Sequence, residues 1–298
     1  MRHPVSTSSP WGQLTWLFMF LLVMACISLV LSGVLVRFSG IPAERFTALT
    51  DPQPVAWLRL VQAVQAFCIF ICPPLLLRAI GIRPADIRDG RPLPGAWLLV
   101  LLLMICMIPV TNLLVFWNEQ MHFPDAFFTV EHWMREKEDA ARALTDAFLQ
   151  TGGSGAFFCN ILIVGLLAAI GEEMLFRGTL QPILSRLFRS PAGGIVITGF
   201  IFSAIHFQFY GFFPRWLLGM LFGWLFYRTG KLPVAVWAHF LNNFIAILAA
   251  WQIHAGRWPE QVEYFGSRKE DLWFTAAAAL VVCGLLFLTV RKRKPESI

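Results

Sequence analysis

The stretch GLLAAIGEEMLFRGTLQPIL, residues 165–184, decides how the rest of this sequence is interpreted. It has the composition of an apolar helix, yet it holds two adjacent carboxylates and an arginine. Charged side chains inside a membrane helix are costly and by default mark a functional position. The stretch therefore predicts a membrane-spanning segment with a functional site inside it.

Sequence spacing separates the two carboxylates. Glu173 and Arg177 lie four residues apart with the acid first, so they share one helix face and form a favourable pair. Glu172 points about 100° away from Glu173 on the same helix. A charge pair that only fixes helix packing is the alternative interpretation of Glu173 and Arg177. Glu172 has no local charge partner, and an unpaired carboxylate suits a general base.

The composition of the whole chain agrees with a membrane protein. Of its 298 residues, 57% are hydrophobic and 14% are charged, and the mean hydropathy is +0.64. Soluble domains carry about 25% charged residues, so lipid is the expected solvent for much of the chain. The net charge of +6 does not indicate nucleic acid, because the basic residues are spread over loops and no nucleic-acid-binding motif accompanies them.

Several apolar runs predict an all-α fold, a polytopic integral membrane helical bundle of about eight transmembrane helices, within a range of seven to nine. The runs are Trp11–Val36, Val55–Leu77, Pro94–Trp117, Gly155–Leu187, Pro191–Phe207, Phe213–Tyr227, Leu232–Trp251 and Leu272–Val290. We expect residues 1–298 to form a single membrane domain. The polar, net acidic segment 118–150 is expected to be an amphipathic surface segment, with a substrate-contacting rim as the alternative.

Basic residues in the short loops predict an orientation. They lie after the second, fourth, sixth and eighth runs: Arg78, Arg83, Arg88, Arg91, Arg186, Arg189, Arg228, Lys231 and the cluster 291–294. With eight spans, all of these fall on one side of the membrane and segment 118–150 falls on the other. The positive-inside rule then places both termini in the cytoplasm, against the contrary signal of Arg257, Arg268 and Lys269. We expect a location in a bacterial inner (plasma) membrane.

Two further apolar runs carry polar side chains. The stretch FSAIH ends at His206, and HFLNN begins at His239. His239 and Asn243 are four residues apart and share a helix face. A lone histidine in an apolar helix is more often a hydrogen-bonded packing residue, but polar side chains on three helices favour one shared site. At 1.5 Å per residue, these residues and Glu172 lie about 12–22 Å from the cytoplasmic helix ends, so they can line one cavity.

EEMLFRG (172–178), FSAIH (202–206) and HFLNN (239–243) resemble the three motifs of the CPBP intramembrane proteases. This family is also called the ABI, CAAX-protease or bacteriocin-processing family. The resemblance covers residues 155–251, which would form the catalytic core. EExxxR alone is weak evidence, but its order and spacing with the other two motifs are specific. The resemblance implies an intramembrane glutamic endopeptidase that hydrolyses a peptide bond of a membrane-associated protein or peptide.

The same resemblance implies roles for individual residues. Glu172 matches the general base, and His206 matches the residue that helps to hold and polarise the attacking water. His239 and Asn243 match the pair that stabilises the oxyanion, for which preorganised donors in a low-dielectric site are effective. The supporting positions are matched by Glu173 and Arg177.

Zinc is the chemical alternative to a site without cofactors. Glu172, His206 and His239 are residue types that can bind zinc and leave a position for water. However, the zincin signature HExxH is absent from the sequence. An amide such as that of Asn243 is also a poor zinc ligand and a good hydrogen-bond donor. We therefore favour a metal-free mechanism.

Two other functions stay open at this point. Intramembrane Glu, His and Arg also build proton relays in transporters, although no repeated hydropathy pattern indicates inverted halves. A non-catalytic scaffold or immunity protein of the same fold is the second alternative, disfavoured because Glu172 and His239 are both present. The expected partners are a peptide or protein substrate and the lipid bilayer, without nucleic acid.

Overall fold

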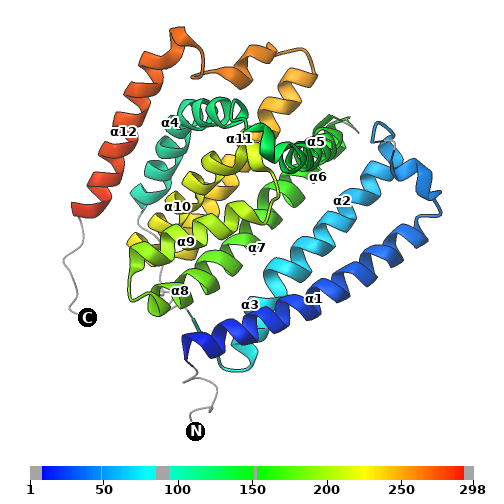
Figure 1. Cartoon of the computed structure of the whole chain (residues 1–298), viewed down its shortest axis with the longest axis horizontal. Coiled ribbons are helices and arrows are strands. Elements are labelled where there is room, and N and C mark those ends of the chain that lie inside the picture. The colour runs from blue at the N-terminus through cyan, green and yellow to red at the C-terminus, as the bar shows by residue number, and fades with distance from the viewer. Residues whose placement is uncertain (1–8, 48, 85–93, 151–152, 292–298) are drawn as a thin grey trace.

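The computed structural model describes residues 9–47, 49–84, 94–150 and 153–291, and all regular structure within them is helical (Figure 1). The α-helices are α1 (Pro10–Phe38), α2 (Pro52–Ala66), α3 (Cys72–Ala79), α4 (Pro94–Glu119), α5 (Phe128–Gln150), α6 (Gly153–Asn160), α7 (Ala168–Leu175), α8 (Gln181–Leu187), α9 (Pro191–Ala204), α10 (Phe212–Thr229), α11 (Leu232–His254) and α12 (Leu272–Arg291). Short 3-10 turns lie between them: η2 (Ala43–Phe46), η4 (Asp125–Phe127), η7 (Phe209–Gly211), η8 (Glu260–Tyr264) and η9 (Lys269–Asp271).

Among the described residues, six helical segments are long and apolar enough to cross a membrane. They are Pro10–Phe38, Pro52–Ala79, Gly95–Glu119, Gly153–Leu187, Leu232–His254 and Lys269–Phe287. The fifth and sixth predicted runs form the shorter α9, of 14 residues, and α10, of 18 residues, which pack against each other. Each of the eight apolar runs therefore contains a helix, and the protein is a polytopic helical membrane protein.

The fifth run ends earlier than predicted. It was expected to stay helical to Phe207, but α9 stops at Ala204 and His206 lies in the following turn. Phe207 has a φ of 52°, in the left-handed region that a helix cannot continue through. His206 is therefore held by a loop rather than by a regular helix.

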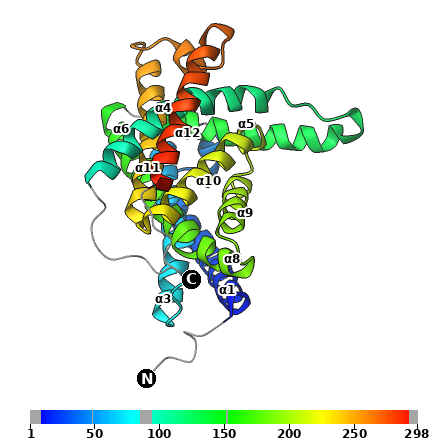
Figure 2. The ribbon, with the colours of Figure 1, turned by 90° about the vertical axis from the view of Figure 1, so that its left-hand side faces the viewer.

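Segment 118–150 is mostly helical. The last residues of α4 and the whole of α5 belong to it, and in Figure 2 the connection between these two helices projects sideways from the bundle. Apolar side chains at the start of α5 are exposed, among them Phe127, Phe128, Val130 and Trp133. The segment predicted as an amphipathic surface segment is therefore helical over most of its length.

Two of the membrane-spanning segments contain π-helical turns. The second span holds η3 (Phe67–Ile71), and the span from α6 to α8 holds η5 (Ile161–Leu167) and η6 (Phe176–Leu180). Such wide turns occur frequently at functional sites. Beside η6 the Thr179 hydroxyl donates a hydrogen bond to the Met174 backbone carbonyl at 3.0 Å. Of these three turns, η5 directly precedes α7 in the chain, η6 directly follows it, and η3 of the second span packs against it.

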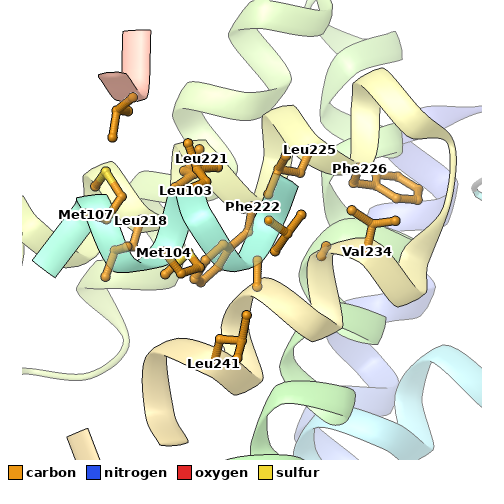
Figure 3. Packing of buried hydrophobic residues seen from close by; sticks show 14 residues of the cluster. Leu103, Met104, Met107, Leu218, Leu221, Phe222, Leu225, Phe226, Val234 and Leu241 are labelled. Carbon is orange, nitrogen blue, oxygen red and sulfur yellow. The ribbon is translucent and has the colours of Figure 1, made fainter. Parts of the chain in front are cut away.

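Buried apolar side chains join α4, α10 and α11, as the labelled residues in Figure 3 show. Leu103 and Met104 of α4 face Phe222 and Leu225 of α10 in this cluster, and Leu241 comes from α11. A second cluster joins α1, α3 and the helices from α7 to α9. The charged residues of α7 thus lie between two apolar clusters.

The helix ends alternate between two sides of the bundle. In Figure 1 the start of α1, the α8–α9 connection and the end of α12 lie toward the lower left, and the α1–α2 and α11–α12 connections lie toward the upper right. Arg186 of the predicted basic set lies at the end of the bundle where α1 begins, because its guanidinium donates to Gln13 Oε1. Arg88, Arg91 and residues 292–294 of the predicted basic set lie outside the described residues.

Candidate active site

Glu172 and Glu173 lie on α7, which is pressed against the second span at Gly171. A Cβ atom on this glycine would lie 2.9 Å from the Cβ atom of Phe70 in η3, closer than real Cβ contacts. Only a residue without a side chain permits this approach. The two carboxylates are therefore placed in the middle of the bundle, away from its outer surface.

Glu173 and Arg177 form the ion pair that their spacing predicts. The Arg177 Nη1 atom donates to Glu173 Oε1 at 2.7 Å, and both side chains are completely buried. Arg177 Nη2 also donates to the Gly219 carbonyl of α10 at 2.8 Å. The guanidinium carbon lies 4.8 Å from the ring centre of Phe202 and 5.4 Å from that of Phe222. One charged pair thus connects α10 to the span that carries α7.

His239 of α11 lies between the two carboxylates. Its Nδ1 is 2.9 Å from Glu173 Oε1, and its Nε2 is 3.9 Å from Glu172 Oε2. The carboxylate is an acceptor, so Nδ1 carries the proton of that hydrogen bond. The imidazole stacks on Phe222 at 5.0 Å between ring centres. Its Nε2 is consequently the atom directed toward Glu172.

Glu172 is the carboxylate without a close partner. The residue is 8% exposed, and its Oε2 atom is buried with no hydrogen-bond partner among the described residues. The distance of 3.9 Å between Glu172 Oε2 and His239 Nε2 is longer than a hydrogen bond. Arg215, at the start of α10, acts on Glu172 only as a more distant charge. A buried carboxylate of this kind is expensive, which favours a functional explanation.

His206 is oriented by the end of its own helix. Its Nδ1 donates to the Phe202 carbonyl at 2.7 Å, so in the neutral ring Nε2 is left as an acceptor. The ring of Phe202 makes edge contacts with both histidines, at 5.2 Å to His206 and 5.7 Å to His239. The two predicted histidines therefore share one aromatic neighbour.

Asn243 follows His239 by one turn and already has a hydrogen-bond partner. Its Nδ2 donates a hydrogen bond to the backbone carbonyl of Val164, in the π-helical turn η5, at 3.0 Å. Asn242 donates to its Oδ1 at 3.3 Å. An amide nitrogen carries two hydrogens, so one N–H group is left for a further acceptor.

The zinc alternative can be compared with this geometry. Within the described parts of the chain, no group of three or more His, Cys, Asp or Glu side chains could hold a metal ion. The metal-free mechanism stays a prediction.

Sequence reasoning missed several residues of the site. Phe202 and Phe222 pack between the charged groups, and Gly219 and Val164 contribute backbone carbonyls. Phe202 had a detectable signal, because it lies four residues before His206 in the same motif. The other three had none, since an apolar residue or glycine in an apolar helix looks like ordinary packing.

The fold and the site together define a helical membrane protein in which two carboxylates, an arginine and a histidine form one buried charged cluster. Residues 154–245 match the type II CAAX prenyl endopeptidase Rce1-like family, and this stretch is called below the Rce1-like domain after that match. The match confirms the resemblance that the three motifs indicated.

Two curated relatives come from Bacillus subtilis (strain 168). The chain is 29% identical over 107 residues to the sporulation-killing factor biosynthesis protein SkfC, covering 33% of this chain and 21% of the relative. It is 35% identical over 93 residues to the uncharacterized protein YpbD, covering 29% of this chain and 43% of the relative. The alignments thus span less than half of each relative's length. No solved structure matches the chain significantly.

Proposed function

We propose that this protein is an intramembrane glutamic endopeptidase in which Glu172 is the general base. The observation that carries the proposal is the buried, unpartnered Oε2 atom of Glu172, 3.9 Å from His239 Nε2. The adjacent Glu173 also has a buried Oε2 atom without a partner, but its Oε1 atom is bound to both Arg177 and His239, so its charge is already compensated by the ion pair. The family of the 154–245 domain supports hydrolysis of a peptide bond.

The site has the same net charge in two different protonation states. Glu173 and Arg177 cancel each other, which leaves Glu172 and His239 to share one proton. With the proton on His239, Glu172 is a carboxylate that can deprotonate water and His239 is an imidazolium with a free Nε2–H donor. With the proton on Glu172, both residues are neutral. Both arrangements have the same net charge, so the proton can move without creating an uncompensated buried charge.

In the proposed reaction, Glu172 removes a proton from water as the water oxygen attacks the carbonyl carbon of the scissile peptide bond. His206 Nε2 accepts a hydrogen bond from this water. His239 Nε2–H and the second N–H of Asn243 donate to the oxyanion that forms. Glu172 then returns its proton to the leaving amine as the carbon–nitrogen bond breaks. No step requires a metal ion or another cofactor.

We further propose a membrane-associated peptide or protein as the substrate, because the base is buried within the bundle. We also propose the bacterial inner (plasma) membrane as the location, with both termini in the cytoplasm. The basic residues Arg186, Arg189, Arg228 and Lys231, which follow the fourth and sixth apolar runs, support this orientation.

The test is proteolysis by the purified protein in detergent micelles. The probe is a library of internally quenched peptides with apolar flanks, and mass spectrometry identifies the products. We expect cleavage by the native protein and none by Glu172→Gln. Since detergent supports no ion gradient, cleavage would also exclude a purely transport function. Absence of cleavage with every peptide, or equal cleavage by Glu172→Gln, would contradict the proposal.

A further inference from the structure

The loop that carries His206 is held by two side chains from outside the Rce1-like domain. This loop, called here the His206 loop, comprises residues 205–213, which connect α9 to α10 and include the first two residues of α10. It contains the left-handed residue Phe207, so its backbone cannot satisfy its own hydrogen bonds as a helix does. Polar backbone groups in a membrane protein need partners from elsewhere in the chain.

Asn118, near the end of α4, bonds the His206 loop at two points. Its Nδ2 donates to the Phe209 carbonyl at 3.0 Å, and its Oδ1 accepts from the Phe213 backbone N–H at 3.0 Å. Asn118 is 4% exposed, so neither bond is exchanged readily for water. One amide therefore bonds both the start of η7 and the first turn of α10.

Glu138 of α5 bonds the same loop from a second helix. Its Oε2 accepts from the Tyr210 backbone N–H at 3.0 Å. Packing reinforces this contact, because the rings of Trp133 and Phe209 lie 5.3 Å apart and the Arg135 guanidinium lies 4.5 Å from the Tyr210 ring centre. Asn118 and Glu138 thus bond the backbone at the three positions 209, 210 and 213, all within seven residues of His206.

We propose that Asn118 and Glu138 are positioning residues, which keep His206 in the position required for catalysis by anchoring the His206 loop. The inference rests on the proposed function, because it assumes that the position of His206 matters for turnover. It gives the α4–α5 segment a role in the site although this segment lies outside the matched domain. Its test must separate control of His206 from general stabilisation of the fold.

The first measurement compares variants of Glu138. Glu138→Ala removes the acceptor for the Tyr210 N–H, and we expect kcat to fall by about 10–100-fold with KM little changed, since a 1 Å misplacement of an active-site group costs up to about 100-fold. Glu138→Gln keeps an acceptor oxygen and should restore most of the activity. The matched control is Glu136→Ala, on the exposed side of the same helix. Equal loss in the Ala and Gln variants would contradict the proposal.

The second measurement is a double-mutant cycle with His206→Ala. If Glu138 acts through His206, Glu138→Ala should have little further effect on the residual activity of His206→Ala. Additive losses would show that Glu138 acts by another route and would overturn the inference. Asn118→Ala provides a second cycle with the same expectation.

Hydrogen exchange tests the hold on the loop independently of proteolysis. We expect peptides that cover residues 205–213 to exchange faster in Asn118→Ala and Glu138→Ala than in Glu136→Ala, with the rest of α9 and α10 unchanged. Unchanged exchange in the loop would overturn the inference even if the protein is an active protease. Faster exchange without any peptidase activity in the native protein would instead point to failure of the proposed function.

Discussion

Glu173 on α7 accepts a hydrogen bond from His239 on α11 across 2.9 Å, although the two residues are 66 positions apart in the chain. The bond fixes which nitrogen of the imidazole faces Glu172. Because Glu173 is also paired with Arg177, the orientation of His239 depends on a fully buried ion pair. Several experiments follow from this arrangement.

Glu172→Gln should abolish proteolysis while the protein still inserts and folds. The amide keeps the size of the side chain but cannot accept the proton of water. It also removes a buried charge, so thermal stability in detergent should be retained or raised. The measurement is peptide cleavage together with the melting temperature of the purified variant. Full activity of the purified variant would refute the assignment of Glu172 as the base.

Arg177→Ala should lower the folded yield as well as the activity. It leaves Glu173 buried without its cation, and breaking a buried pair from one side typically costs about 3–5 kcal/mol. Thermal unfolding measures the loss. The control is Arg142→Ala, whose exposed contact with Glu119 at 3.6 Å should contribute at most about 1 kcal/mol. Equal stability of the two variants would be incompatible with a buried Glu173–Arg177 pair that stabilises the fold.

Asn243→Ala should reduce turnover by about 10²–10³, the usual loss for one oxyanion donor. Substrate binding should change little, because the interaction forms in the transition state. Asn242→Ala serves as the control, since its one described hydrogen bond goes to Asn243 at 3.3 Å. A rise in KM with unchanged kcat would assign Asn243 to substrate binding instead.

Chelation should leave the activity intact. If Glu172 acts alone as base, exhaustive treatment with a chelator and elemental analysis should give an active enzyme without stoichiometric zinc. If the histidines bind zinc, binding should release protons and activity should return only with added metal. One tightly bound zinc ion per active chain would replace the metal-free mechanism with a metalloprotease mechanism.

Gly219→Ala should weaken both the packing and the site. A Cβ atom there would lie 3.0 Å from the Cα atom of Gly199, so α9 and α10 must separate. Overpacking typically costs about 1–3 kcal/mol, and the shift would also move the carbonyl that Arg177 binds. Gly284→Ala on α12, where nothing lies within 4 Å, is the matched control. Equal melting temperatures would show that the helix crossing adapts without cost.

The sequence allowed the eight apolar runs and the Glu173–Arg177 pair to be predicted, since hydropathy and the spacing of four residues are local properties. The end of α9 was misplaced because no glycine or proline marks it, and the stop comes from the conformation of Phe207. The contacts of Asn118 could not be predicted, because its partners lie 91 and 95 residues away and are backbone groups. Hydropathy also carries no information on the number of residues per turn, so the π-helical turns were missed.

The π-helical turns before and after α7 determine how the orientation of this span responds to the deletion of a residue. A π turn corresponds to one extra residue in an α-helix, and each residue turns the helix by about 100°. Deleting one residue from η5 would let that turn revert to ordinary α geometry. Because the wide turn already takes up the rotation of that residue, the part of the span before α7 would keep nearly its present orientation to the carboxylates, whereas deleting a residue from α7 itself would rotate that part by about 100°. The wide turns are therefore the places where this span can lose one residue without rotating its polar side chains away from one another.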